Sequence, residues 1–233
     1  MVTFEDFMER LARGPLKNTA AVEKTNLGEI VPDYWDTIRA LTNEGLREIS
    51  TKKVVTTGRV RVTWVDSQSD YVLKEDNIGV YLEDYSETGE QQFTDDLFVR
   101  VTNIWAIMDD DVDDVRVVMD SGQGISTPSF NRLRVSSDFR TFYEDGIRVQ
   151  YQARHPALTT VASEIDLPPN LEYALQLFVA SQYISQMNGA EHTKRGEEYR
   201  AKYLSEMGED EAKNLSSTSI IDADVRFQDR GFV

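Results

Sequence analysis

The sequence predicts an α+β protein in which helices from both ends of the chain accompany an inserted antiparallel β domain. Apolar residues recur three and four positions apart in residues 1–52 and 156–214, as in amphipathic helices. Residues 53–155 instead contain short alternating runs, separated by turn-forming pairs. Residues 215–233 begin with a Ser/Thr-rich hinge and have no domain of their own. We therefore expect a helical bundle from the N- and C-terminal helix pairs, the β domain, and an extended C-terminal arm.

Two helices are predicted near the N-terminus. The first begins after Thr3, whose hydroxyl can cap it, and ends at Gly14-Pro15. The second begins at Pro32, a residue favoured in a first helical turn, and continues through Ser50. Each helix has an apolar face for a core, formed by Phe4, Phe7, Met8 and Leu11 in the first and by Tyr34, Trp35, Ile38, Leu41, Leu46 and Ile49 in the second.

Strands are predicted throughout the β domain. The clearest are Val60–Trp64 and Ile147–Ala153, where apolar residues alternate with arginine, glutamine or threonine. Many short strands at close spacing indicate an antiparallel sheet or a small sandwich. Trp64 and Trp105 lie in apolar strand patterns, so we expect both in the core. Further strands are predicted at Tyr71–Lys74, Ile78–Leu82, Leu97–Met108, Val115–Met119, Asn131–Val135 and Phe139–Tyr143.

Two more helices are predicted after Pro156. Leu171–Met187 is apolar almost all the way round, which is typical of a helix buried on more than one side. The next helix, at about residues 190–214, has only a thin apolar stripe and mixed charges. We expect it to have an exposed outer face.

The composition excludes several classes of function. The chain has 25 Lys and Arg against 41 Asp and Glu, and its net charge of -16 argues against a protein that grips DNA with its whole surface. The absence of cysteine excludes disulfides and thiolate metal sites. No glycine-rich phosphate loop or nucleophile elbow occurs. No apolar run reaches the roughly 18 residues of a membrane span, and no signal peptide is visible. We expect a soluble protein made in a cytoplasm, without a membrane partner.

Few residues offer catalytic or metal-binding chemistry. His155 and His192 are interpreted as a strand-boundary residue and a solvated helix residue, not as members of a catalytic triad. Asp109–Asp114 offers carboxylate oxygens to a divalent cation but lacks the glycine and closing glutamate of an EF-hand loop. A solvated hairpin loop is the favoured interpretation there. We predict no catalytic residue, no metal site and no cofactor.

Four arginines come from neighbouring predicted strands: Arg132, Arg134, Arg140 and Arg148. Together they could form a basic patch for phosphate or for an acidic partner. The favoured alternative is that they point outward and pair with the abundant acidic residues.

The C-terminal arm is the most informative segment. Apolar and aromatic residues on an extended terminus are costly unless a partner covers them. Such an arm commonly adds to another subunit's sheet edge or groove. Packing back onto the chain's own β domain is an equal alternative. The residues that would make these contacts are Ile220, Ile221, Val225, Arg226, Phe227, Phe232 and Val233.

Six segments follow one another in an order that suggests a family: Thr42–Ile49, Tyr151–Pro156, Leu158-Thr159, Asp166–Pro168, Leu171–Leu175 and Val225–Val233. A tyrosine-containing polar helix separates the last two. In this succession the chain resembles the head-to-tail adaptor (connector, or head completion) proteins of tailed bacteriophages. The resemblance covers both helical ends and the arm, whereas the β domain matches only in position.

The resemblance implies a structural virion protein and no enzyme. Adaptors of this family form a ring, usually of twelve copies, below the portal. The ring extends the DNA channel, helps to retain packaged DNA and provides the platform for tail attachment. The implied partners are the portal protein, tail or nozzle proteins and other copies of the chain, while packaged DNA passes without specific binding. Residues 215–233 are then the candidate portal-binding arm, and the protein is expected at the head-to-tail junction after synthesis in the host cytoplasm.

Two other functions stay open at the level of the sequence. One is a carboxylate-based polysaccharide hydrolase, although close carboxylate pairs arise by chance among 41 acidic residues. The other is a ligand-binding β module carried on a helical platform. An enzyme would need polar groups that converge in a concave site, and the sequence shows no such group.

Overall fold

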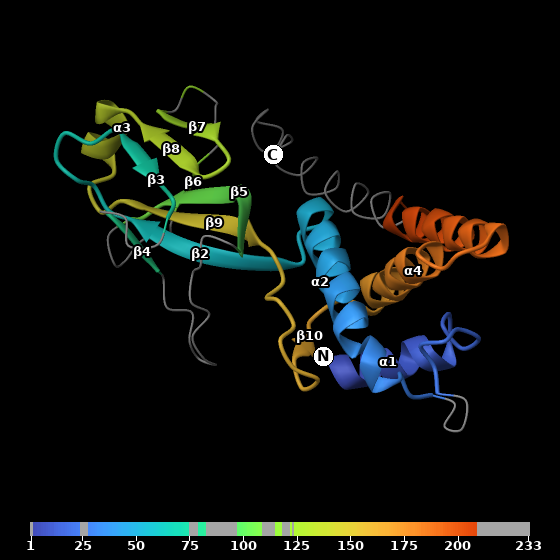
Figure 1. Cartoon of the computed structure of the whole chain (residues 1–233). Coiled ribbons are helices and arrows are strands. Elements are labelled where there is room, and N and C mark those ends of the chain that lie inside the picture. Colours follow the sequence, from blue (N-terminus) through green and yellow to red (C-terminus); the bar gives the residue numbers. More distant parts are fainter. Residues whose placement is uncertain are drawn as a thin grey trace, which may run out of the picture. The chain divides into compact units, whose positions relative to one another are not determined.

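The computed structural model describes residues 2–23, 28–74, 79–82, 97–108, 115–117, 122 and 124–208. The chain divides into two compact units (Figure 1). One, here called the helical unit, lies within Met1–Leu46 and Ala157–Val233. The other, here called the β unit, is Arg47–Pro156. The mixture of helices and antiparallel strands confirms the predicted α+β class.

Helices form where local sequence signals predict them. The helix α1 (Phe4–Arg13) follows a short strand, β1 (Val2–Thr3). Thr3 caps α1, because its Oγ1 accepts a hydrogen bond of 3.1 Å from the Asp6 backbone N. A 3-10 turn at Pro32–Tyr34 precedes α2 (Trp35–Lys52), so the second helix begins slightly later than predicted. The later helices are α4 (Pro169–Ser185) and a helix at residues 190–208.

The core of the helical unit is built around α4. Buried residues occur on almost every side of this helix, as its sequence predicts. Gly45 allows α2 to approach it closely: a Cβ at Gly45 would lie 2.6 Å from Leu175 Cδ1 and 2.7 Å from Phe178 Cδ1. The ring of Phe178 also meets that of Tyr203 edge to face, with centroids 5.4 Å apart.

Glu172 is a carboxylate within this buried helix. Its side chain is only 9% exposed, and it forms an ion pair with Arg10 of α1. Gln176 Nε2 donates a second, longer hydrogen bond of 3.4 Å to the same carboxylate oxygen. Because a buried carboxylate is costly without partners, this contact explains how an acidic residue is accommodated in an otherwise apolar helix.

Hydrogen bonds to its backbone hold the segment after Pro156 against the N-terminal part of the helical unit. Strand β10 (Glu164–Ile165) pairs antiparallel with β1. The amide of Asn43 bonds twice to Leu158: Asn43 Nδ2 donates to Leu158 O at 3.1 Å, and Leu158 N donates to Asn43 Oδ1 at 2.7 Å. Arg39 Nη1 adds a bond of 2.7 Å to Thr159 O. The side chains of Asn43 and Arg39 in α2 therefore hold the segment that connects the β unit to α4.

The β unit contains two antiparallel sheets. The larger has the strand order β4-β2-β9-β5-β6 and the smaller the order β3-β8-β7. The strands of the larger sheet are β2 (Thr56–Val62), β4 (Val80–Leu82), β5 (Phe98–Ala106), β6 (Val115–Val117) and β9 (Ile147–Ala153). Those of the smaller sheet are β3 (Asp70–Val72), β7 (Ile125–Ser129) and β8 (Arg132–Val135).

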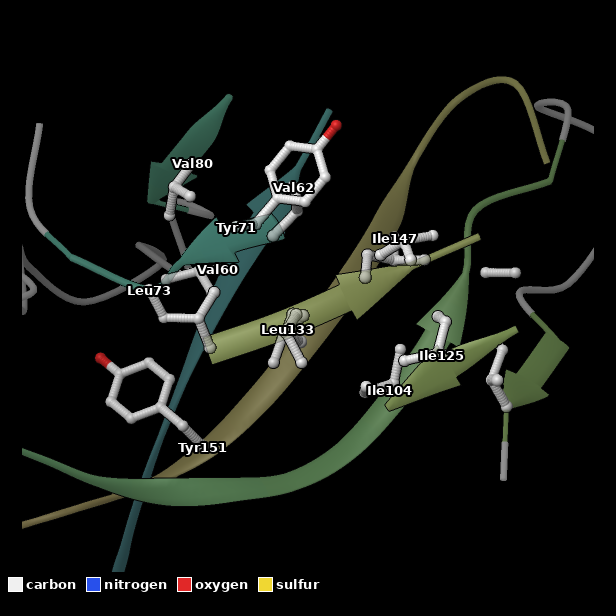
Figure 2. Close-up of a cluster of buried hydrophobic side chains, with 14 of the residues drawn as sticks. Val60, Val62, Tyr71, Leu73, Val80, Ile104, Ile125, Leu133, Ile147 and Tyr151 are labelled. Carbon is white, nitrogen blue, oxygen red and sulfur yellow. The ribbon is translucent and has the colours of Figure 1, made fainter. Parts of the chain in front are cut away.

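One apolar cluster joins the two sheets. Figure 2 shows Val60, Val62, Ile104 and Ile147 of the larger sheet together with Leu133 of the smaller one. Each lies on the buried, apolar face of its strand, where every second side chain points. This arrangement corresponds to the small sandwich that the strand spacing indicated. Tyr71, Leu73, Val80, Ile125 and Tyr151 complete the labelled part of the cluster.

One strand prediction was wrong, and one strand was not predicted. Residues predicted as a strand at Phe139–Tyr143 lie largely in a short helix, α3 (Ser137–Phe142). Ser136 caps this helix, since its Oγ accepts a bond of 3.2 Å from Phe139 N. Strand β7 was not predicted, because its Ser/Thr/Pro sequence lacks apolar alternation; pairing with β8 makes it a strand.

The two tryptophans predicted in strands differ in position: Trp64 follows the end of β2, whereas Trp105 lies within β5. Trp64 packs against the core, with its ring centroid 5.8 Å from that of Tyr71. Trp105 is half-buried and lies between Ile104 and Ala106, both of which are fully buried. Alternation therefore places Trp105 on the outer face, and the expectation that it belongs to the core was wrong.

We predict that Gly45→Ala destabilises the protein by about 1–3 kcal/mol, because the added methyl group overlaps Leu175 and Phe178. Thermal or urea unfolding measures the change. Gly208→Ala is the matched control, since a Cβ there meets nothing within 4 Å and alanine favours the helix by up to about 1 kcal/mol. Equal effects of the two substitutions would contradict the close approach of α2 and α4.

We also predict that stability falls at alkaline pH. Burial raises the pKa of Tyr151 from 10.0 to about 12, and burial together with Tyr34 raises the pKa of Tyr183. A raised folded-state pKa stabilises the protein fully below pH 10, and this contribution is lost as the pH rises from 10 to about 12. For Tyr151 the loss is at most about 3 kcal/mol.

Urea unfolding at several pH values tests this prediction, with Tyr151→Phe as the comparison. Phenylalanine keeps the ring, which covers Gly58 on the neighbouring strand, but cannot ionise. The variant should lose less stability than the wild type between pH 10 and 12. Identical pH dependence of the two proteins would show that Tyr151 does not contribute.

Candidate functional site

Several residues that were considered as functional candidates lie outside the described part of the chain. These are the loop Asp109–Asp114 and the arm residues Ile220, Ile221, Val225, Arg226, Phe227, Phe232 and Val233. Of the two histidines, His155 is buried at the end of the β unit, where its backbone N donates a bond of 3.1 Å to Ser50 Oγ. His192 is half-exposed in the helix at residues 190–208. Among the described residues, no three His, Asp or Glu side chains are grouped so that they could hold a metal ion.

The four predicted arginines do not form one patch. Arg132 and Arg134 of β8 both pair with Asp70, at 3.4 and 3.1 Å from its Oδ1 atom. Arg140 Nη1 donates to two backbone carbonyls, at 2.7 Å from Gln68 O and 3.3 Å from Val65 O. Pairing with an acid is thus confirmed for Arg132 and Arg134. Arg148 belongs to the other sheet.

The register of β9 brings Arg148 into a different group. Arg148 pairs with Arg61 of β2 on one side and with Trp105 of β5 on the other, and Trp105 pairs with Arg116 of β6. Residues directly opposite in antiparallel strands point to the same face. This face is opposite to the core, because Val60, Val62, Ile147 and Val149 are the buried neighbours. We call Arg61, Arg148, Trp105 and Arg116 the arginine row.

A second row of polar side chains lies beside the first. Arg59 lies over the Trp105 ring, with its Cζ atom 5.9 Å from the ring centroid. Asn103 links the strands, since its Nδ2 donates to Gln150 Oε1 at 3.0 Å and its Oδ1 accepts from Arg116 Nη2 at 2.8 Å. These contacts hold Arg116 and the Trp105 region in defined positions.

One end of the same face is closed by the last turn of α2. Gln152 is completely buried, and its Nε2 donates to Ser50 O and, at 2.8 Å, to Lys53 O. Its Oε1 accepts a bond of 2.9 Å from Arg100 Nε. The face therefore changes along β9 from a buried amide at Gln152 to a half-exposed guanidinium at Arg148.

The arginine row concentrates positive charge in a chain of net charge -16. Neighbouring strands are about 4.8 Å apart, so the row extends about 14 Å from Arg61 to Arg116. Among the residues that the structure describes, Arg61 and Arg116 bond to uncharged oxygens only: Arg61 to the backbone O of Asp145 at 3.4 Å, and Arg116 to Asn103. Planar guanidinium groups at such spacing can bind carboxylates or phosphates through paired hydrogen bonds.

Sequence reasoning missed most of this site. It selected Arg148 but not Arg59, Arg61 or Arg116, and it assigned Trp105 to the core. The alternation of Arg59 and Arg61 with buried valines showed that both arginines point outward. Grouping them with Arg116 requires the strand order and register, which no local pattern specifies.

A scan against models of known protein families gives no match, and a search of curated proteins gives none either. Within the described residues, no helix is both long and apolar enough to cross a membrane.

We predict that Gln152→Leu destabilises the β unit by about 2–4 kcal/mol, because it leaves the buried carbonyls of Ser50 and Lys53 without their donor. Gln150→Leu, two residues away on the same face, should cost less than about 1 kcal/mol because Gln150 is half-exposed. Urea unfolding of both variants measures the difference. A cost for Gln152→Leu no larger than that for Gln150→Leu would refute the anchoring role.

Proposed function

We propose that this chain is a structural protein of the head-to-tail junction of a tailed bacteriophage. Copies of it form a ring below the portal, with twelve members by resemblance to the adaptor family. The ring extends the DNA channel, helps to retain packaged DNA and carries the tail or nozzle proteins. The work of such a protein is done by shape and contacts, without a catalytic step.

One observation supports this proposal most directly: segments that carry the resemblance contact one another in the helical unit. Asn43, from Thr42–Ile49, bonds in both directions to Leu158, from Leu158-Thr159. Gly45 of the same segment lies against Leu175, which ends Leu171–Leu175. If the segments shared with the adaptor family form one structural framework, they should contact one another in the fold. These contacts agree with that expectation.

The remaining parts are assigned by the same proposal. The N- and C-terminal helix pairs form a bundle that builds the ring wall, and the β unit faces outward or toward the tail. The arm of residues 215–233 extends to the portal. The excess of acidic over basic residues supports a channel wall that does not hold DNA, because like charge keeps a sliding polyanion off the surface.

The arm assignment is tested by truncation. We predict that a chain ending at Leu215 loses binding to the portal protein of the same virus by about 100-fold or more, because several apolar anchors are removed together. Phe227→Ser with Phe232→Ser in the full chain should weaken binding about tenfold or more, whereas Ser216→Ala with Ser217→Ala should not. Native mass spectrometry or biolayer interferometry with purified portal gives the affinities.

Undiminished portal binding by the truncated chain would remove the arm assignment. A full chain with no portal partner that instead hydrolyses a glycan would overturn the proposed function as a whole and favour the hydrolase alternative.

A further inference from the structure

We propose that the arginine row is an interface between copies of this chain, where it receives a carboxylate-bearing surface of a second copy. The inference rests on the proposed function in one respect, namely that copies assemble side by side. The inference goes beyond the proposed function because it names the surface, the residues and the chemistry of the contact.

A closed ring needs two different surfaces on every copy. In cyclic symmetry each copy presents one face to the neighbour on its left and another to the neighbour on its right. Opposite charges on the two faces fix the direction of assembly and disfavour contacts between like faces. The arginine row is a positive surface on a strongly acidic chain, and a copy of the same chain supplies abundant carboxylates.

The geometry of the row suits a protein surface. Its guanidinium groups project from a sheet whose register fixes their spacing, and Asn103 holds Arg116 by a bond of 2.8 Å. Trp105 lies at the centre of the row with Arg59 over its ring. An aromatic residue flanked by arginines is the composition that protein interfaces favour at their energetic centre.

The helical unit offers a concave acidic surface of complementary charge. A cavity of about 460 Å³ is lined by Glu5, Glu9, Glu23 and Glu29, and by Trp35. Glu9 also forms an ion pair with Arg13 of its own helix, so among the described residues the acidic character of the cavity comes from four carboxylates against one neighbouring guanidinium. Trp35 is 40% exposed there, so part of its ring is accessible to a partner. Its Nε1 donates to Ile30 O at 2.9 Å, which fixes the ring beside the carboxylates. This cavity is the counterpart that we expect the arginine row of a neighbouring copy to meet.

Nucleic acid is the competing occupant of an arginine-bearing sheet face. Phosphates bind guanidinium groups as carboxylates do. A nucleic acid strand, however, extends beyond a row of about 14 Å and meets the net charge of -16 of the whole chain. We therefore favour the compact protein partner and make nucleic acid binding an outcome of the test.

Zero-length cross-linking tests the interface. Arg61→Lys and Arg148→Lys retain the charge and introduce an amine that a carbodiimide couples to a carboxylate in contact, with loss of water. Unlabelled and nitrogen-15-labelled copies of the full-length variant are mixed at high concentration and cross-linked, and the linked peptides are identified by mass spectrometry. Links between labelled and unlabelled peptides report contacts between copies.

Arg132→Lys is the matched control. Arg132 is also an exposed strand arginine, but it contacts Asp70 within its own chain, so its links should join peptides of the same label. For the arginine row we expect mixed-label links to the peptides that contain Glu5, Glu9, Glu23 or Glu29. Absence of such links, or a yield no higher than the mixed-label background of the control, overturns the inference.

Charge reversal gives an independent measurement. Arg61→Glu with Arg148→Glu should weaken self-association about tenfold or more in sedimentation experiments, and mixing with Glu5→Lys, Glu9→Lys copies should restore it. Unchanged self-association, accompanied by loss of binding to a single-stranded or duplex oligonucleotide, would overturn the inference in favour of nucleic acid.

The two proposals can fail separately. Mixed-label links in a protein that does not bind the portal would retain this interface and reject the proposed function. A ring on the portal without those links would retain the proposed function and reject the interface.

Discussion

The register of strand β9 is the constraint on which the β unit depends. β9 pairs with β2 on one side and β5 on the other, and its residues alternate between the two faces of the sheet. Val149 thereby enters the core while Arg148 joins the outer row. A slip of one residue would bury the guanidinium of Arg148 and expose Val149. The slipped register would be strongly disfavoured, because burying an unpaired charge costs a large free energy. The same alternation therefore stabilises the fold and produces the charged surface.

Local signals in the sequence predicted the longer helices well, whereas the short helix α3 was predicted as a strand. Thr3 and Gly14 mark the ends of α1 because capping bonds form between residues close in the chain, and the all-round apolar pattern of α4 predicted its burial. Non-local features could not be predicted in this way. Trp105 lies in an apolar run, yet its face is decided by pairing with Arg148 and Arg116 across strands. The grouping of the site arginines depends on the same pairings, which join residues distant in the chain.

The structure separates charged residues that stabilise the fold from those available for contacts. Arg10 balances the carboxylate of Glu172 within the helical unit, and Arg134 pairs with Asp70 at the smaller sheet. Removing either partner of the first pair would leave a poorly solvated charge. Arg61 and Arg116, in contrast, bond to neutral oxygens among the residues described. A charged side chain that is held in place but not neutralised by any residue in the described part of the chain is suited to a partner.

The central claim is that this chain assembles into a closed ring on a portal. Co-expression with the portal protein of the same virus, followed by native mass spectrometry of the purified complex, measures the number of copies directly. Our account predicts one dominant stoichiometry with a fixed number of copies per portal, twelve if it follows the adaptor family. A portal that carries no copies, or a broad distribution of numbers without a closed species, would contradict it.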